Sequence, residues 1–432
     1  MNADAHAIIM LAAFEMLDEQ LRAALASQRD LLADAGNYPD IFDNPTKPDA
    51  EKDPVDPDWR RFCRFPDDLP GPCMHMWPKH PVTQQQHRRP MIEHLLRSAS
   101  DALAGGENDA FVKFVGCLSH YIGDVCQPAH LMDLALLEQL IPPPAHWRDF
   151  HYHTDLEAVT GPCAALEPPR PLGVDVEEIA WRLAGACSLA AVDCRQYVVP
   201  SVQALFAGDD TEAQRLAQGP VTRSAQLTAD VWSSLWHASR GTLPPNAETL
   251  AELDLRHWPA DEQRHDSVYG AAIVDGNRRL AGAQRTVAKA MLAGDDGQPR
   301  AVTGLGVLPH SGMNGPRDTW LHYSLPPRVF DRFDAAAGLH AELGAAGAVA
   351  FVVELDGREV FRHETRDANA PATPVHVPLH DATTLTLRVE DASGGRSFWD
   401  NHTVWARPRL IRRPLTPQPN HHDTAAHAPS AG

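Results

Sequence analysis

The sequence lacks a long apolar run, and this excludes a helix that spans a membrane. Such a helix needs about 18–20 consecutive apolar residues, and no stretch of the 432 residues reaches that length. The start of the chain also lacks the basic, apolar and small-residue regions of a secretory leader. Taken as a complete sequence, the protein is expected to be cytoplasmic.

Paired cysteines and an excess of positive charge are missing as well. The seven cysteines are an odd number and none stands in a C-x-x-C pair, so their spacing excludes a cysteine-rich zinc site. Lys and Arg number 38 against 57 Asp and Glu, which gives a formal charge of −19. Nonspecific attraction to nucleic acid or to an anionic membrane is therefore not expected to drive function. A phosphate could still bind where metal ions reverse the local field.

Hydrophobic patterning divides the chain into a helical part and a β-rich part. The length alone predicts two or three domains. Residues 1–240 carry apolar side chains at helical spacing, for example Phe111 and Val115. From Gly304 the pattern changes to short apolar runs, and Asp356-Gly357 between two of them predicts a hairpin. The expected fold is multidomain, with an all-α bundle followed by an all-β sandwich.

Four segments are expected along the chain. They are a helical domain over 1–240, a partly helical connector over 241–299, a β-sandwich over 300–411 and a disordered tail over 412–432. The connector should hold a helix near Val274 to Leu292. Inside the helical domain, the Pro- and Asp-rich stretch from Tyr38 to Pro81 has no helix or strand periodicity and is expected to be a loop. A loop this long inside a compact domain is usually functional.

The strongest chemical signal is a set of His and carboxylate residues in the helical part. His120 and Asp124 lie four residues apart, as do His153 and Glu157, and this spacing places both members of a pair on one helix face. A proline two residues before His130 should bend the chain and turn this histidine toward the same cavity. One such pair alone is an ordinary surface feature, but two pairs and a further histidine are hard to attribute to chance. Zinc accepts these nitrogen and oxygen ligands when no thiolate is offered.

The run from Ser119 to His130, SHYIGDVCQPAH, resembles the signature of the zinc-dependent phospholipase C and single-strand nuclease family. The resemblance extends over residues 1–240 and implies an all-α bundle with a trinuclear zinc site. By this analogy the first metal is bound by Asp40, His75, His120 and Asp124. The second is bound by His130, His153 and Glu157. The third is bound by His6, by the chain terminus at Met1 and by the second oxygen of Asp124. Asp40 is also the expected catalytic base.

Some of these positions have a competitor, and the chain start departs from the family. The competing pairs are His151 with His153, His80 with His75, and Asp43 with Asp40. Only His153 has an acid four residues further on. In the family, a Trp released by leader cleavage binds metal through its amino group and carbonyl, whereas Met1 stands here. The family resemblance implies a secreted or extracytoplasmic protein, in contrast to the absence of a leader.

The metal ligands do not separate a lipid substrate from nucleic acid. The resemblance implies hydrolysis of a phosphodiester by metal-activated hydroxide. Glu rather than Asp at position 157 resembles the phospholipase branch, and we expect a phospholipase C that cleaves phospholipid headgroups. The alternative is a single-strand nuclease or nucleotidase, in which Trp59, Trp77 and Trp147 could stack on bases. A catalytically degenerate binding protein is a third possibility, which the complete ligand set disfavours.

Three stretches of the β-rich part carry a second resemblance. They are Gly304 to Ser311 with Trp320 to Leu325, Phe351 to Phe361, and Asp400 to Ala406. These stretches resemble the opening, the central hairpin and the closing motif of an NPCBM domain, a type of module associated with carbohydrate binding. The resemblance implies a glycan as partner. His310, Asp400 and His402 are residue types that can bind a metal, but we do not expect a second metal site in the β-rich part.

Overall fold

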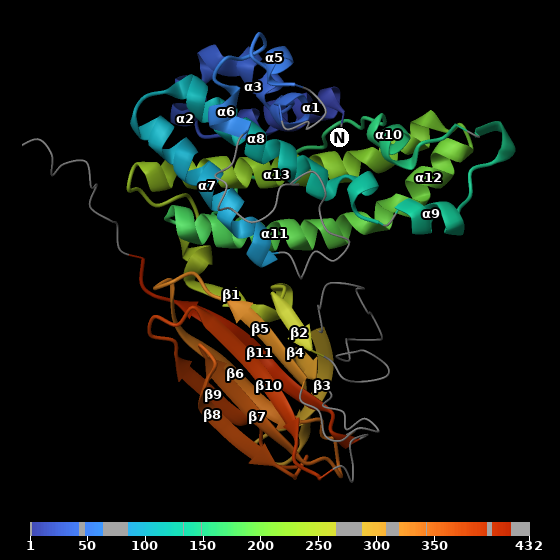
Figure 1. Cartoon of the computed structure of the whole chain (residues 1–432). Helices are drawn as coiled ribbons and strands as arrows, with labels where there is room; N and C mark the ends of the chain where they lie inside the picture. Colours follow the sequence, from blue (N-terminus) through green and yellow to red (C-terminus); the bar gives the residue numbers. More distant parts are fainter. Residues whose placement is uncertain are drawn as a thin grey trace, which may run out of the picture. The chain divides into compact units, whose positions relative to one another are not determined.

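The computed structural model describes residues 2–42, 48–63, 85–132, 134–147, 149–264, 287–307, 319–342, 344–394 and 400–415. The chain divides into two compact units (Figure 1). The helical unit contains residues up to Cys63 and from His87 to Thr249, and the β unit extends from Leu250 to Pro414. The predicted change from helical to β-rich structure along the chain is confirmed.

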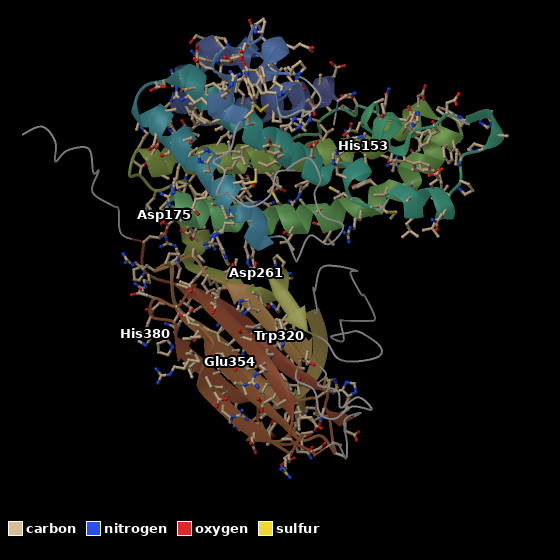
Figure 2. All side chains as sticks on the ribbon, in the orientation of Figure 1. His153, Asp175, Asp261, Trp320, Glu354 and His380 are labelled. Carbon is tan, nitrogen blue, oxygen red and sulfur yellow. The ribbon has the colours of Figure 1, made fainter. Side chains whose placement is uncertain are left out.

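The helical unit is built from α-helices, several of which begin at a capping carboxylate. Their bounds are α1 (Ala3–Glu15), α2 (Glu19–Ala24), α3 (Arg29–Ala35), α4 (Tyr38–Phe42), α5 (Asp49–Lys52), α6 (Trp59–Cys63), α7 (Gln85–Ala104), α8 (Asn108–Cys126), α9 (Leu134–Leu140), α10 (Tyr152–Glu157), α11 (Val176–Cys194), α12 (Val198–Phe206) and α13 (Asp210–Ser239). The Asp175 side chain accepts a hydrogen bond from the backbone of Glu178 at the start of α11 (Figure 2). Such caps satisfy N–H groups that a helix start leaves open. Among the described helices, none is long and apolar enough to cross a bilayer.

Helix α8 forms the centre of the helical unit. It packs against α1, α3, α11 and α13, and from Ala110 to Cys126 every residue except Lys113 is buried. A helix that is surrounded on nearly all sides occupies a core position. His120 and Asp124 belong to this helix, so the chain places an imidazole and a carboxylate inside its own core.

The stretch from Tyr38 to Pro81, expected to be a loop, is partly helical where the structure describes it. It contains α4, α5 and α6, and the ring of Phe42 stacks on that of Trp59 with centroids 5.6 Å apart. Each of these helices has only four or five residues. The expectation is wrong here because a helix of about one turn is too short to show a hydrophobic period.

The prediction of a helix near Val274 to Leu292 is wrong for the C-terminal part of this range. Val287–Ala293 is a strand, β3, which pairs antiparallel with β4 (Pro299–Val307). Between these strands the chain turns through Gly297, whose φ of 73° is readily adopted by glycine. The earlier part of the expected helix lies outside the described residues. A short apolar run is compatible with either a strand or a helix, and here the hydrogen-bonded pairing with β4 makes this segment a strand.

The β unit consists of two antiparallel sheets. Its other strands are β1 (Glu252–Asp254), β2 (Glu262–Arg264), β5 (Thr319–Ser324), β6 (Phe330–Leu339), β7 (Val349–Leu355), β8 (Arg358–Thr365), β9 (Thr373–Pro378), β10 (Thr384–Asp391) and β11 (Thr403–Arg412), and short 3₁₀ helices, η5 (Ala247–Ala251) and η6 (Leu255–His257), flank β1. One sheet has the order β3-β4-β11-β6-β9, with β1 paired to β11, and the other has the order β2-β5-β10-β7-β8. Trp405 of the first sheet meets Phe351 of the second with ring centroids 5.0 Å apart. The two sheets therefore share a core, as in the predicted sandwich.

Two smaller expectations for the β unit have different outcomes. The predicted hairpin is confirmed, because β7 and β8 are joined by Asp356 and Gly357 with φ values of 49° and 74°. Positive φ at both positions is typical of the tight turn that matches strand twist. The expected tail, in contrast, begins too early, since Arg412 is the last residue of β11. Residues 416–432 lie outside the described residues.

An extended segment from residue 158 to 173 lies along α13 and follows the helix that carries His153 and Glu157. The backbone N–H groups of residues 164, 167, 170 and 172 donate hydrogen bonds of 2.8–2.9 Å to Thr222, Gln226, Asp230 and Ser234. These acceptors are four residues apart and so form one row along α13. The row fixes the chain that leaves α10 and limits how far α10 can move.

Replacing Asp230 with Ala should lower the free energy of unfolding of the helical unit by about 1–3 kcal/mol, because one buried and one partly buried donor lose their acceptor. The Asp230 carboxylate is 4% exposed and accepts from both Arg170 N–H and the Gln226 amide. The matched control is Thr222→Val, whose partner N–H is exposed and can bind water instead. Urea unfolding followed by the helical circular dichroism signal measures both losses. Equal losses for the two variants would contradict the role given to Asp230.

Candidate metal centre

Seven of the side chains expected as metal ligands, Asp124 among them, lie close together and come from five segments. α8 supplies His120 and Asp124, α1 supplies His6, α4 supplies Asp40, the 3₁₀ turn η2 (Pro128–His130) supplies His130, and α10 supplies His153 and Glu157. The bend at Pro128 ends α8 and turns His130 back toward Asp124, as expected from the sequence. The sequence-distant members are brought together because α1 and α4 pack on α8 and α10 packs on η2.

Asp124 is the buried centre of this arrangement, with 2% of its side chain exposed. Its Oδ1 lies 3.7 Å from His6 Nε2 and 3.8 Å from His130 Nε2, and its Oδ2 lies 3.3 Å from His120 Nε2. Burial raises the pKa of this carboxyl, but neighbouring positive charge, including that of His120 and His130, holds the pKa well below its usual range. Two carboxylate oxygens that face different imidazoles suit a ligand shared between metal ions.

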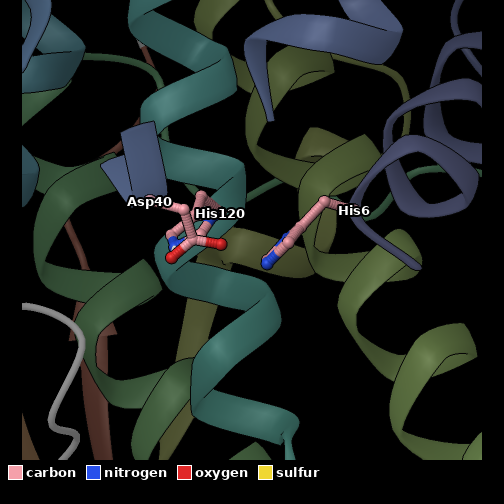
Figure 3. A group of neighbouring side chains, drawn as sticks. All are labelled: His6, Asp40 and His120. Atoms are coloured by element: carbon pink, nitrogen blue, oxygen red, sulfur yellow. Dashed lines mark ion pairs between the residues drawn. The ribbon is translucent and has the colours of Figure 1, made fainter. Parts of the chain in front are cut away.

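His6, Asp40 and His120 form the first of two groups with the geometry of a metal site. One ligand atom from each lies within 4.8 Å of the others, and the three side chains point toward one another (Figure 3). The imidazole rings of His6 and His120 stack with centroids 4.0 Å apart, and His120 Nε2 lies 3.6 Å from Asp40 Oδ1. The Asp40 side chain is 51% exposed, so this group is open to solvent on the Asp40 side.

His130, His153 and Glu157 form the second group. His130 Nε2 lies 2.7 Å from Glu157 Oε1, and His153 Nδ1 lies 3.5 Å from Glu157 Oε2. Burial raises the pKa of Glu157, but the hydrogen bond with His130 and nearby positive charge outweigh it and lower the pKa to about 2. The carboxylate is therefore ionised at neutral pH. His153 is 48% exposed, which opens this group to solvent as well (Figure 2).

The His6 side chain provides the test of whether these residues fit a metal. It is 1% exposed, and neither ring nitrogen has a hydrogen-bond partner among the described residues. Burial, with the charge of His120, lowers the pKa of His6 well below its usual value, so the imidazole is neutral and keeps a lone pair. A buried polar group without a partner is costly. A metal ion bound by His6 would give its lone pair a partner, and the residues therefore fit a metal ion.

A backbone carbonyl fixes the orientation of His120. His120 Nδ1 lies 2.7 Å from the carbonyl oxygen of Gly36, which can only accept, so Nδ1 carries the proton. The other ring nitrogen, Nε2, is the one that faces Asp40 and Asp124. Metal-binding histidines are oriented by this kind of second hydrogen bond.

The remaining expected ligands have separate outcomes. Met1 and His75 lie outside the described residues, as do the competitors Asp43 and His80. His151 precedes α10, is exposed, and belongs to neither ligand group among the described residues, whereas His153 belongs to one. The assignment of individual metals to these ligands remains a prediction. Where the analogy separates His6 from Asp40, the structure places their ligand atoms in one group.

Gly123 is a residue of the centre that the sequence analysis did not assign a role. A Cβ atom at this position would lie 2.9 Å from His6 Cε1 and 3.0 Å from His6 Nδ1. Glycine inside a helix costs about 1 kcal/mol relative to alanine, so a glycine directly before Asp124 in the last turn of α8 is a signal that could have been used. Gly123 leaves the space that the His6 ring occupies.

Comparison with known proteins gives a domain match and distant structural likenesses. Residues 288–411 match the family model of the NPCBM/NEW2 domain, which confirms the second resemblance. No curated protein matches the chain. Among solved structures, the chain is similar to the CBM51 module of Clostridium perfringens GH95 in complex with methyl-galactose, with 22% identity, a TM-score of 0.29, and coverage of 37% of this chain and 99% of that one. The chain is also similar to Clostridium perfringens alpha-toxin from an avian strain, with 11% identity, a TM-score of 0.35, and coverage of 93% of this chain and 86% of that one. Its similarity to the alpha toxin of Clostridium absonum has 10% identity, a TM-score of 0.34, and coverage of 95% of this chain and 99% of that one.

Replacing Gly123 with Ala should displace the His6 ring and weaken zinc binding about tenfold, the size of effect seen when a ligand loses its support. Zinc titration against a competing chelating dye measures the change. Gly105→Ala is the control, because a Cβ there would lie no closer than 3.4 Å to another group and the residue is outside the centre. If the loss acts through the His6 ring, then Gly123→Ala should have little further effect in a His6→Ala background, where the ring is absent. Additive losses would contradict this link.

Proposed function

We propose that the helical unit is a zinc-dependent phosphodiesterase and that its substrate is the headgroup phosphodiester of a phospholipid. The observation that carries the proposal is the neutral His6 imidazole, which has no hydrogen-bond partner among the described residues and faces the ionised Asp124 carboxylate at 3.7 Å inside the core. Burying an imidazole whose nitrogens make no hydrogen bond costs free energy, and a bound metal ion would remove this cost. The resemblance of the sequence between residues 119 and 130 to the zinc-dependent phospholipase C family supports the same proposal.

The donor set favours zinc over the common alkaline-earth ions. His6, His120, His130 and His153 offer imidazole nitrogens together with carboxylate oxygens. Magnesium and calcium prefer all-oxygen ligands, whereas imidazole suits zinc and related transition metals. Zinc, when bound, lowers the pKa of a water molecule and offsets the charge of a phosphate.

The exposure of the ligands determines where the substrate enters. His6, His120 and Asp124 are buried, whereas Asp40 and His153 are about half exposed. The phosphate must therefore approach from the side on which Asp40 and His153 lie. Asp40, at the edge of the first group, is within reach of a water molecule beside the phosphate and is our candidate for the general base.

The burial of Trp59 counts against the nuclease alternative. A nuclease needs open aromatic faces on which bases stack. Trp59 is buried, is stacked on Phe42 and is covered by the guanidinium of Arg60, so it offers no such face. Trp147 packs against Phe150 with ring centroids 5.6 Å apart. Trp77 lies outside the described residues.

We further propose that the β unit binds a glycan. The support is the match of residues 288–411 to the NPCBM/NEW2 domain, a type of module associated with carbohydrate binding. The chain would then combine a hydrolase with a module that recognises a sugar-coated surface.

Purified protein should retain zinc after dialysis, and Asp124→Asn should lose both zinc and hydrolysis. The reason is that three imidazoles approach the two oxygens of Asp124. Hydrolysis of a chromogenic phosphocholine diester should fall by about 10²–10³-fold, as when a group that stabilises transition-state charge is lost. The corresponding losses for His120→Ala and Glu157→Ala should be no larger. Less than one zinc per wild-type chain would overturn the proposal, and faster cleavage of single-stranded DNA than of the diester would replace lipid by nucleic acid.

Removing the chain from Leu250 onward should leave a folded helical unit that still binds zinc and cleaves soluble diesters. The buried core cluster of the helical unit extends only from Ala5 to Trp236, and Glu157 is the last of its expected ligands. Circular dichroism, zinc content and turnover compared with the full chain measure the outcome. Normal zinc content with lost turnover would show that the β unit contributes to catalysis.

A further inference from the structure

The side chain of Asn2 connects the two ends of the candidate centre. Asn2 Nδ2 donates a hydrogen bond of 3.0 Å to the carbonyl oxygen of Ala158, and Thr160 Oγ1 donates one of 2.9 Å to Asn2 Oδ1. Ala158 directly follows Glu157, and Asn2 directly precedes α1, the helix that carries His6. A single carboxamide thus joins the helix of one ligand to the segment that follows another.

The same carboxamide also sets the start of α1. Asn2 Oδ1 accepts a hydrogen bond of 2.9 Å from the backbone N–H of Ala5, which makes Asn2 the N-cap. His6 lies in the first turn of the helix, and its own N–H donates to the Asn2 carbonyl oxygen at 3.2 Å. Because helix ends fray easily, the position of the His6 ring depends on this cap.

The distance between the two ligand groups matters because they meet at one atom. His6 Nε2 and His130 Nε2 approach the same Asp124 Oδ1, and Glu157 holds His130 at 2.7 Å. α1 packs on α3, α8 and α13, whereas α10 packs on η2, α9 and α12. The contacts of Asn2 with Ala158 and Thr160 therefore tie together two helices that rest on largely different neighbours.

We propose that Asn2 is a positioning residue, whose carboxamide holds α1 and the end of α10 at the spacing at which His6 and Glu157 can serve one metal cluster. The proposal rests on the zinc centre proposed above. Residues that support ligands in this way typically change metal affinity by about 10–100-fold. The donor bond to Ala158 is the part of the contact that a simple helix cap does not need.

The variant Asn2→Asp separates positioning from capping. Aspartate caps a helix as well as asparagine does and is favoured at a helix start by the dipole, so the bonds from Ala5 and Thr160 remain. It has no N–H to donate to the Ala158 carbonyl. The added negative charge would attract zinc, so a loss of affinity cannot result from the charge itself.

The experiment uses the full chain and two readouts, which are zinc affinity against a competing chelating dye and the melting temperature of the metal-free protein. Asn2→Asp should bind at least one zinc about tenfold more weakly, while its metal-free melting temperature stays within about 2 °C of the wild type. Thr160→Val should weaken zinc binding in the same direction, and Thr160→Ser, which keeps the hydroxyl, should match the wild type.

Each other outcome identifies what fails. Wild-type affinity in Asn2→Asp and Thr160→Val, with zinc bound normally by the wild type, would overturn the positioning role and leave the zinc centre standing. A fall in metal-free melting temperature without a fall in affinity would reduce Asn2 to a helix cap and would also overturn it. Absence of zinc from the wild type would overturn the centre and the positioning role together.

Discussion

A carboxylate that remains charged inside a helical core is the constraint on which the site depends. Asp124 is 2% exposed and lies on α8, which is surrounded by other helices. An ionised group in such a place must be paired, since its desolvation costs several kcal/mol. The chain supplies imidazoles from α1, from α8 itself and from the turn after it, and the packing of α1 on α8 brings His6 to Asp124.

The local sequence gives up helix stability to accommodate these imidazoles. Gly123 stands in the last turn of α8, where alanine would be the better helix former, because a Cβ would collide with His6. Pro128 ends the same helix early, so that His130 can turn back toward Asp124. Sites of this kind break local rules, and the surrounding structure compensates. Here the compensation includes the buried row of acceptors on α13 that fixes the segment after α10.

Local spacing was enough to predict some ligands and not others. His120 with Asp124, and His153 with Glu157, are detectable because four residues make one helical turn. His6 and Asp40 have no partner near them in sequence, so only the family resemblance proposed them. Gly123 and Asn2 act through contacts with residues that are distant in sequence, and a local sequence pattern cannot reveal such contacts. The same limit explains β3, whose seven residues fit either helix or strand until β4 pairs with them.

The protonation states show that the centre is prepared for a metal before one binds. Metal ligands must be deprotonated, and each proton that has to leave weakens binding. Burial lowers the pKa of His6, so its imidazole is neutral at neutral pH, and neighbouring positive charge keeps Asp124 ionised although burial alone would favour its protonated form. The pKa of Glu157, lowered to about 2, keeps this carboxylate charged across the physiological range. A metal ion would therefore displace no proton from His6, Asp124 or Glu157, and its positive charge would take the place of the neighbouring positive charge that keeps the two carboxylates ionised.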